Sequence, residues 1–116
     1  IKKLQKANFR IVLFSGDTRG TAAGIAKKLD IELIKTATAD EKLAELCRLD
    51  ASTCVAIGNG AIDEAMLKAA RLGIVTLQAE GVFVPTLLAA DVIMPSINDA
   101  LDMLLDPAIF VATLRR

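Results

Sequence analysis

The chain has 116 residues, of which 53% are hydrophobic, and its 14 basic and 14 acidic residues give a formal net charge of zero. This length is typical of one domain with a hydrophobic core, and the zero net charge argues against broad electrostatic binding to nucleic acids or anionic lipids. Aromatic residues make up 3% of the chain, so base-stacking surfaces are not expected. The lack of histidine excludes histidine-based catalytic triads and histidine metal sites.

The hydropathy pattern and the cysteines predict the environment of the chain. No apolar run approaches the roughly 18 residues of a transmembrane helix, and Cys47 and Cys54 lack the spacing of a zinc site or a disulfide framework. We therefore predict a cytoplasmic protein with neither a membrane nor a nucleic-acid partner. Because residues 1–10 are typical of the second half of a helix leading into a strand, we expect residues 1–116 to be one domain that is incomplete at its N-terminus.

Short apolar runs alternate along the chain with segments of helical periodicity. The runs predict five strands, at residues 9–15, 31–34, 53–57, 74–77 and 91–94. The periodic segments predict helices at residues 17–29, 38–49, 62–72, 84–90 and 96–105, with N-caps at Asp17, Thr38 and Ser96 and a further helical turn at Pro107. This alternation predicts a three-layer, doubly wound α/β fold with a parallel sheet, whose ligands bind beyond the carboxyl ends of the strands.

The end of the first predicted strand has the composition of an anion site. Ser15 offers a hydroxyl, Gly16 lets the backbone approach a ligand, and the next helix directs its positive N-terminus to the same place. These features suit a phosphate group. An ordinary strand-to-helix turn capped by Asp17 explains the same residues equally well.

Lys42 falls in the first turn of the helix that follows the second strand. A cation there opposes the helix dipole at a small cost. It can neutralise an anion held over the strand ends, although a solvated surface lysine is the simpler interpretation.

The third strand ends in the segment GNGAID, residues 58–63. Two glycines around Asn59, followed by Asp63 within one helical turn, form a tight loop with oxygen ligands of the kind that Mg²⁺ accepts. The alternative is a plain turn in which Asp63 favours the helix N-terminus.

Taken in order, these segments resemble the motifs of the haloacid dehalogenase (HAD) superfamily of phosphohydrolases, and most closely its soluble branch related to the phosphorylation domain of P-type ATPases. The stretch LFSGDTRGTA resembles the second motif of that family, Lys42 within TADEKLAEL the third, and AIGNGAIDEAMLKAARLGIV the fourth. The segment EGVFVPTLLAADVIMPSINDALDMLLDP resembles the part that follows. The resemblance runs from Arg10 to the C-terminus.

The resemblance implies Mg²⁺-dependent phosphoryl transfer through an aspartyl-phosphate. By position, Ser15 and Gly16 would bind phosphate, Lys42 would be the catalytic lysine that offsets charge, and Asn59 and Asp63 would serve the metal. Such chemistry depends on positioning and electrostatic stabilisation. The substrate would be a small phosphorylated molecule or a phosphoprotein, no cap domain is evident, and association with a second copy of the chain is compatible with an open site.

Three departures from the family pattern stand out. The nucleophile motif is absent, so we expect it on about 30 to 45 residues upstream of Ile1, enough for a strand, a loop and most of a helix. Asn59 replaces the metal-binding aspartate and provides an oxygen without a charge. Ile62 replaces a polar orienting group. These departures motivate a second hypothesis, a non-catalytic phosphate-binding or regulatory module with the same fold.

The absent nucleophile strand would lie between the first and third strands of this chain. Without it, the five strands could close into one sheet of order 2-1-3-4-5. We favour a slot left open for another segment, because closure would bury edges with unpaired backbone groups. An alternative nucleophile, Asp17 in the segment DTRGT, would leave too few residues before Lys42 for another crossover.

Overall fold

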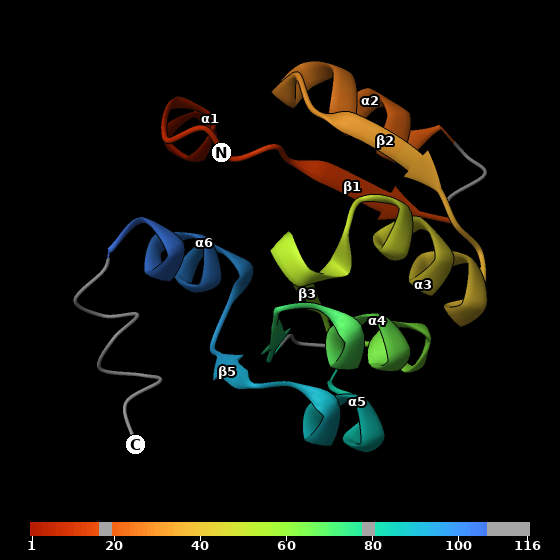
Figure 1. The fold of residues 1–116 in the computed structure, drawn as a ribbon. Helices are drawn as coiled ribbons and strands as arrows, with labels where there is room; N and C mark the ends of the chain where they lie inside the picture. The colour runs from red at the N-terminus through yellow and green to blue at the C-terminus, as the bar shows by residue number, and fades with distance from the viewer. Residues whose placement is uncertain (17–19, 78–80, 107–116) are drawn as a thin grey trace.

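The computed structural model describes residues 1–16, 20–77 and 81–106. Strands and helices alternate through these residues (Figure 1). In chain order they are α1 (Lys2–Lys6), β1 (Val12–Ser15), α2 (Thr21–Leu29), β2 (Glu32–Lys35), α3 (Ala39–Arg48), β3 (Val55–Gly58), α4 (Glu64–Ala69), β4 (Leu72–Thr76), α5 (Val84–Ala89), β5 (Val92–Met94) and α6 (Ile97–Leu105), with short 3-10 turns η1 (Ala51–Thr53) and η2 (Ala61–Asp63). The predicted α/β class is confirmed, with all strand pairs parallel.

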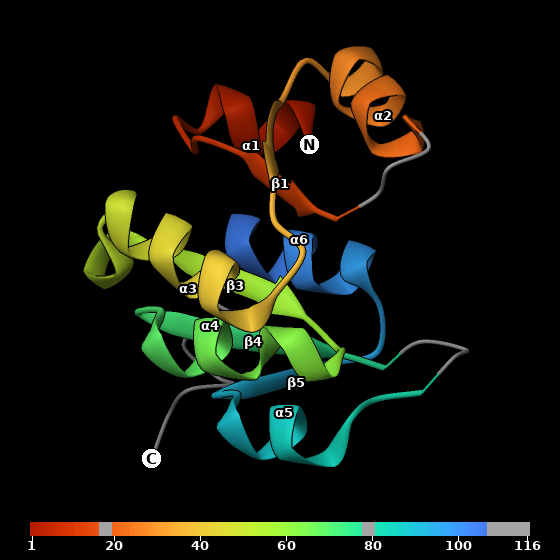
Figure 2. The same cartoon turned by 90° about the vertical axis from the view of Figure 1, so that its right-hand side faces the viewer.

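The strands form two sheets, and this decides between the two arrangements left open by the sequence. Strands β1 and β2 pair in one sheet, and β3, β4 and β5 pair in that order in the other. The single sheet of order 2-1-3-4-5 is therefore wrong, and β1 is not paired with β3. Figure 2 shows the two-stranded sheet with α1 and α2 set apart from the three-stranded sheet below it.

Strands β1 and β3 each have one side that is not paired with another strand of their sheet. The amides of Glu32 and Thr36 bond the carbonyls of Ile11 and Ser15, so by the alternation of a parallel ladder the backbone groups of Val12 and Phe14 point away from β2. Just before β3, the carbonyl of Cys54 accepts from the amide of Leu72, and the same alternation turns the backbone groups of Val55 and Ile57 away from β4. Both sheets thus keep an edge able to pair with another strand.

Strand β4 is the centre of the core, because all five of its residues are buried. On one face Val75 packs with residues of α3 and α4, and on the other Ile74 packs with Ala100 and Met103 of α6. Helices therefore cover both faces of this sheet, as predicted for a three-layer arrangement.

The boundary between two predicted elements, a helix and the strand after it, is corrected. The helix expected at residues 62–72 ends at Ala69, because Leu72 pairs with Val55 and begins β4. Gly73 permits this close packing: a Cβ there would lie 2.3 Å from the carbonyl oxygen of Leu67. The predicted cap at Asp17 and the turn at Pro107 lie outside the described residues. Within the described ranges no helix is long and apolar enough to cross a membrane.

Candidate functional site

Lys42 and Asp63 meet in a buried ion pair although they are 21 positions apart. The Lys42 ammonium donates to Oδ1 of Asp63 over 2.6 Å, and the two side chains are only 11% and 10% exposed. The structure thus brings together two of the residues singled out from the sequence. Their burial also removes the simpler interpretation of Lys42 as a solvated surface residue.

The N-terminal cap of α3 fixes the position of Lys42. Thr38 accepts from the amide of Glu41 over 3.1 Å, and Glu41 in turn accepts from the amide of Ala37 over 3.2 Å. This reciprocal arrangement satisfies two amides at the start of the helix. It places Lys42 in the first helical turn, with the amide of Lys42 bonded to the carbonyl of Thr38.

The second oxygen of Asp63 organises the loop after β3. Its Oδ2 accepts from the backbone amides of Asn59 and Gly60 over 3.1 and 3.0 Å. Both carboxylate oxygens are therefore engaged. Gly58 makes room for this arrangement, because a Cβ there would lie 2.6 Å from Cγ and Oδ2 of Asp63. The GNG segment is the sequence signal for this role of Gly58, which depends on where the Asp63 side chain lies.

The loop before α5 is hydrogen-bonded to the loop after β3. The Asn59 side-chain nitrogen donates to the carbonyl of Gly81 over 3.2 Å, and the amide of Phe83 donates to the carbonyl of Asn59 over 3.1 Å. From α5, the hydroxyl of Thr86 donates to the carbonyl of Gly60 over 2.8 Å. Thr86 is fully buried, and sequence reasoning missed it because its partner is a backbone atom 26 positions away.

Ser15 and Gly16 belong to the other sheet. They lie at the carboxyl end of β1, where the amide of Thr36 bonds the carbonyl of Ser15 over 3.0 Å. A Cβ on Gly16 would be 2.9 Å from the carbonyl oxygen of Thr36, so this position requires glycine for close packing. The Thr36 hydroxyl is buried and has no hydrogen-bond partner among the residues that the structure describes. The segment between Thr36 and Thr38 connects this corner to the helix that carries Lys42.

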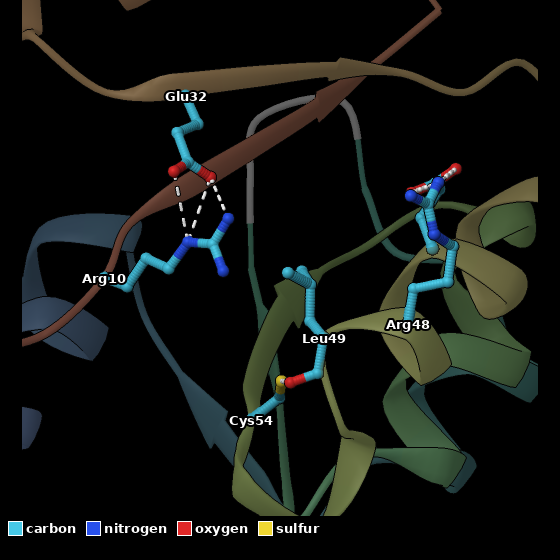
Figure 3. A network of polar contacts seen from close by, with 6 residues as sticks. Arg10, Glu32, Arg48, Leu49 and Cys54 are labelled. Atoms are coloured by element: carbon cyan, nitrogen blue, oxygen red, sulfur yellow. Dashed lines mark hydrogen bonds and ion pairs between the residues drawn. The ribbon is translucent and has the colours of Figure 1, made fainter.

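A second polar cluster lies at the amino end of β1. Arg10 donates to both oxygens of Glu32, at 2.8 to 3.1 Å, and these side chains are 64% and 50% exposed. Hydrogen bonding and the charge of Glu32 raise the pKa of Arg10. Figure 3 shows this pair above Cys54, whose thiol donates to the carbonyls of Leu49 and Asp50. Because Arg10 precedes β1, this pair lies at the end opposite to the one where ligands are expected.

The predicted magnesium ligands fit that ion only in part. Mg²⁺ prefers carboxylate and other oxygen ligands, but both oxygens of Asp63 already accept hydrogen bonds. Asn59 uses its nitrogen for Gly81, which leaves its Oδ1 as the atom able to ligate a cation. No group of three or more acidic or cysteine side chains able to hold a metal occurs among the described residues. By themselves, these residues do not form a magnesium site.

Comparison with solved structures identifies the fold. The chain superimposes on a protein assigned to the HAD family of hydrolases from Streptomyces avermitilis, with a TM-score of 0.73, 18% identity, and coverage of 91% of this chain and 65% of that one. The chain has the HAD fold. The 3-deoxy-D-manno-octulosonate 8-phosphate phosphatase of Moraxella catarrhalis, a structure with magnesium, phosphate and sugar, matches with a TM-score of 0.73 at 21% identity over 97% of this chain and 71% of that one.

P-type ATPases share this HAD fold and resemble the chain in sequence. The catalytic domain of the CPx-ATPase CopB-B matches with a TM-score of 0.72 at 23% identity, over 99% of this chain and 43% of that one. A silver exporting P-type ATPase of Salmonella typhimurium is 36% identical over 104 residues, which span 81% of this chain and 12% of the ATPase. An uncharacterized protein of Methanocaldococcus jannaschii is 48% identical over 61 residues, 53% of this chain and 66% of its own length. No protein-family model matches.

Proposed function

We propose that the chain is the phosphate-handling part of a HAD-type phosphohydrolase that acts through an aspartyl-phosphate. The observation that carries this proposal is the buried Lys42–Asp63 pair beside the loop after β3. The chain spans 66% of one curated relative and 12% of the other, so the activity of the whole protein is inferred from these contacts and from its similarity to phosphatases and ATPases.

In this proposal Lys42 binds and partly neutralises the phosphate. A lysine ammonium has three donors, and Asp63 takes one of them over 2.6 Å. The remaining donors are available to phosphate oxygens. Asp63 acts as a positioning residue, because it fixes the amine and also holds the amides of Asn59 and Gly60. Preorganised donors of this kind stabilise charge that develops during phosphoryl transfer.

Ser15 and Gly16 would complete phosphate binding from the two-stranded sheet. The tight contact between Gly16 and the carbonyl of Thr36 holds this turn in place, and a hydroxyl with a closely approaching backbone suits phosphate oxygens. The segment from Thr36 to Thr38 runs from this turn to the cap of the Lys42 helix.

The nucleophile in this proposal is an aspartate upstream of Ile1, on a strand that pairs with the free edges of β1 and β3. Its carboxylate oxygen would bond to phosphorus as the bond from phosphorus to the ester oxygen breaks, and the leaving oxygen would take a proton from water. Water would then break the acyl-phosphate, release phosphate and restore the carboxylate. The observation in favour is that β1 and β3 are unpaired with each other although both are strands of parallel sheets.

Mg²⁺ remains part of the proposal on one condition. A carboxylate from outside the described residues must join Asn59, since both oxygens of Asp63 are engaged. The predicted partners are unchanged: a small phosphorylated substrate or a phosphoprotein, no nucleic acid, no membrane, and a second copy of the chain as a compatible partner. We also propose a cytoplasmic location, in keeping with Cys47 and Cys54 as free thiols.

The test is hydrolysis of p-nitrophenyl phosphate by the full natural chain with and without added Mg²⁺. We expect turnover that needs the metal and that falls at least a hundredfold in Lys42→Ala, because charge stabilisation of this kind is worth about 10²–10³ in rate. Lys35→Ala is the matched control, since Lys35 is an exposed lysine at the end of β2. Equal turnover in wild type and Lys42→Ala would remove Lys42 from the mechanism.

A second candidate function is a non-catalytic phosphate-binding module. It is favoured by the neutral Asn59, and by the lack of a cluster of three acidic groups in the described part of the chain. Calorimetric titration with inorganic phosphate, run beside the turnover assay, separates the two functions. Phosphate binding without turnover, in a chain that includes an upstream aspartate, would favour this module.

A further inference from the structure

An open pocket of about 420 Å³ adjoins the candidate site. It is lined by Asn59, Gly60, Gly81, Val82 and Phe83. Asn59 and Gly60 are the residues whose amides bond Asp63, so the pocket shares a wall with the Lys42–Asp63 pair. The hydrogen bonds from Asn59 to Gly81 and from Phe83 to Asn59 hold the two sides of the pocket together.

The surface of this pocket is chemically different from the phosphate site. Among the described residues, those that line the pocket carry no charge. The Gly60 amide and carbonyl are already bonded to Asp63 and Thr86, and the Asn59 carbonyl to Phe83. What remains for a ligand is the Oδ1 of Asn59 and the ring of Phe83, which is 46% exposed, whereas Val82 packs in part against the core. Gly81 has φ +92, a left-handed conformation suited to glycine, and it adds no side chain that would fill the space.

On this basis we infer that the pocket is the leaving-group subsite of the proposed phosphohydrolase and takes an uncharged apolar group, best an aromatic ring. The inference rests on the proposed function for the phosphate itself. A phosphate bound at Lys42 would have its ester group directed along the shared wall, and the Phe83 ring would then pack against it. Aromatic contacts of this kind add to affinity beyond the burial of apolar area. Substrates with a charged leaving group gain nothing from such a pocket and lose solvation.

The experiment compares benzyl phosphate with ethyl phosphate, using the full natural chain. Both have a primary alcohol as leaving group, so their intrinsic reactivities are similar and KM reports the subsite. We expect the KM for benzyl phosphate to be about tenfold lower. Phe83→Ala should raise the KM for benzyl phosphate by about tenfold and leave the KM for ethyl phosphate unchanged, whereas Phe83→Leu should give an intermediate value. Leu88→Ala is the control, because Leu88 is an exposed apolar residue of α5 outside the pocket.

A binding measurement separates this inference from the proposed function. Benzylphosphonate and ethylphosphonate, which cannot be hydrolysed, are titrated calorimetrically into the wild type, Phe83→Ala and Phe83→Leu, after circular dichroism has shown that each variant is folded. Preferential binding of benzylphosphonate that depends on Phe83 would support the subsite even if no phosphate ester is turned over. Turnover of both esters with equal KM values, in wild type and in Phe83→Ala, would overturn the subsite and leave the phosphohydrolase proposal intact.

Discussion

The burial of the Lys42–Asp63 ion pair lets us predict how much stability is lost when either residue is replaced. In Asp63→Asn, the amide oxygen can still accept from the backbone amides of Asn59 and Gly60, but Lys42 loses its counter-charge. Its side chain is only 11% exposed, and leaving one member of a buried pair without its partner costs about 3–5 kcal/mol. Lys42→Met should cost about 3 kcal/mol, at the low end of that range, because two amides still bond the Asp63 carboxylate.

The double variant Lys42→Met/Asp63→Asn removes both charges at once. Neutral replacement of a buried pair is often close to neutral in stability, so we expect the double variant to lose less than either single variant. The assay is urea unfolding followed by far-UV circular dichroism, with the free energy of unfolding extrapolated to water. Glu32→Gln in the exposed pair with Arg10 is the control and should cost much less than Asp63→Asn, because solvent screens exposed ion pairs. Additive losses in the double variant, or a loss below about 1 kcal/mol in Asp63→Asn, would refute the reasoning.

Four other variants test the local structure by the same unfolding assay. Gly58→Ala should destabilise by about 1–3 kcal/mol, because its Cβ would overlap Asp63, whereas Gly24→Ala in α2, where a Cβ meets nothing within 4 Å, should stabilise by about 0.5–1 kcal/mol; the reverse order would contradict this packing. Thr38→Ala should cost about 0.5–2 kcal/mol through loss of the α3 cap, and no loss would mean that the cap is dispensable. Arg10→Gln should be less stable than the wild type, and this difference in stability should shrink as salt is added. The pKa of Arg10 is raised above an already alkaline value. The contribution of Arg10 to stability is therefore lost only as pH rises through this raised pKa. We expect the stability lost in Arg10→Gln to be constant from about pH 5 to 9.

Local patterns in the sequence predicted the turns that carry Lys42 and Asp63, whose roles in phosphate chemistry stay predictions. The capping box at Thr38 and Glu41 is a short-range signal, and it fixes the helical turn that carries Lys42. The apolar run before Gly58 likewise predicts a strand that ends at the loop of Asn59. The sequence predicts that Lys42 and Asp63 each lie after the carboxyl end of a strand. Their contact is tertiary, because β2 and β3 belong to different sheets.

Contacts that depend on tertiary packing could not be predicted in the same way. Leu72 has the periodicity of the helix before it, yet it pairs with Val55, since Gly73 lets β4 pack tightly under α4. Thr86 is a polar residue in an apolar helix, and its bond to the carbonyl of Gly60 exists only once α5 packs beside the loop. Neither contact leaves a signal in the residues next to it. The sequence left two sheet arrangements possible, one sheet or two. It could not decide between them, because strands pair at their edges through main-chain groups that every sequence has.

The affinity of the site for phosphate gives a last prediction, which concerns the balance of charge. Lys42 and Asp63 together carry no net charge, so the wild-type pair attracts an anion through the donors of the amine more than through its charge. Asp63→Asn would leave a net positive charge at the same place, and removing a negative charge within several ångströms of a phosphate is worth about 1–3 kcal/mol at the effective dielectric of a protein site. We therefore expect Asp63→Asn to bind inorganic phosphate at least about fivefold more tightly in calorimetric titrations while being less stable to urea. A variant that is destabilised but binds phosphate no better would mean that the Lys42 amine does not face the anion, and the phosphate would then have to be placed elsewhere along the strand ends.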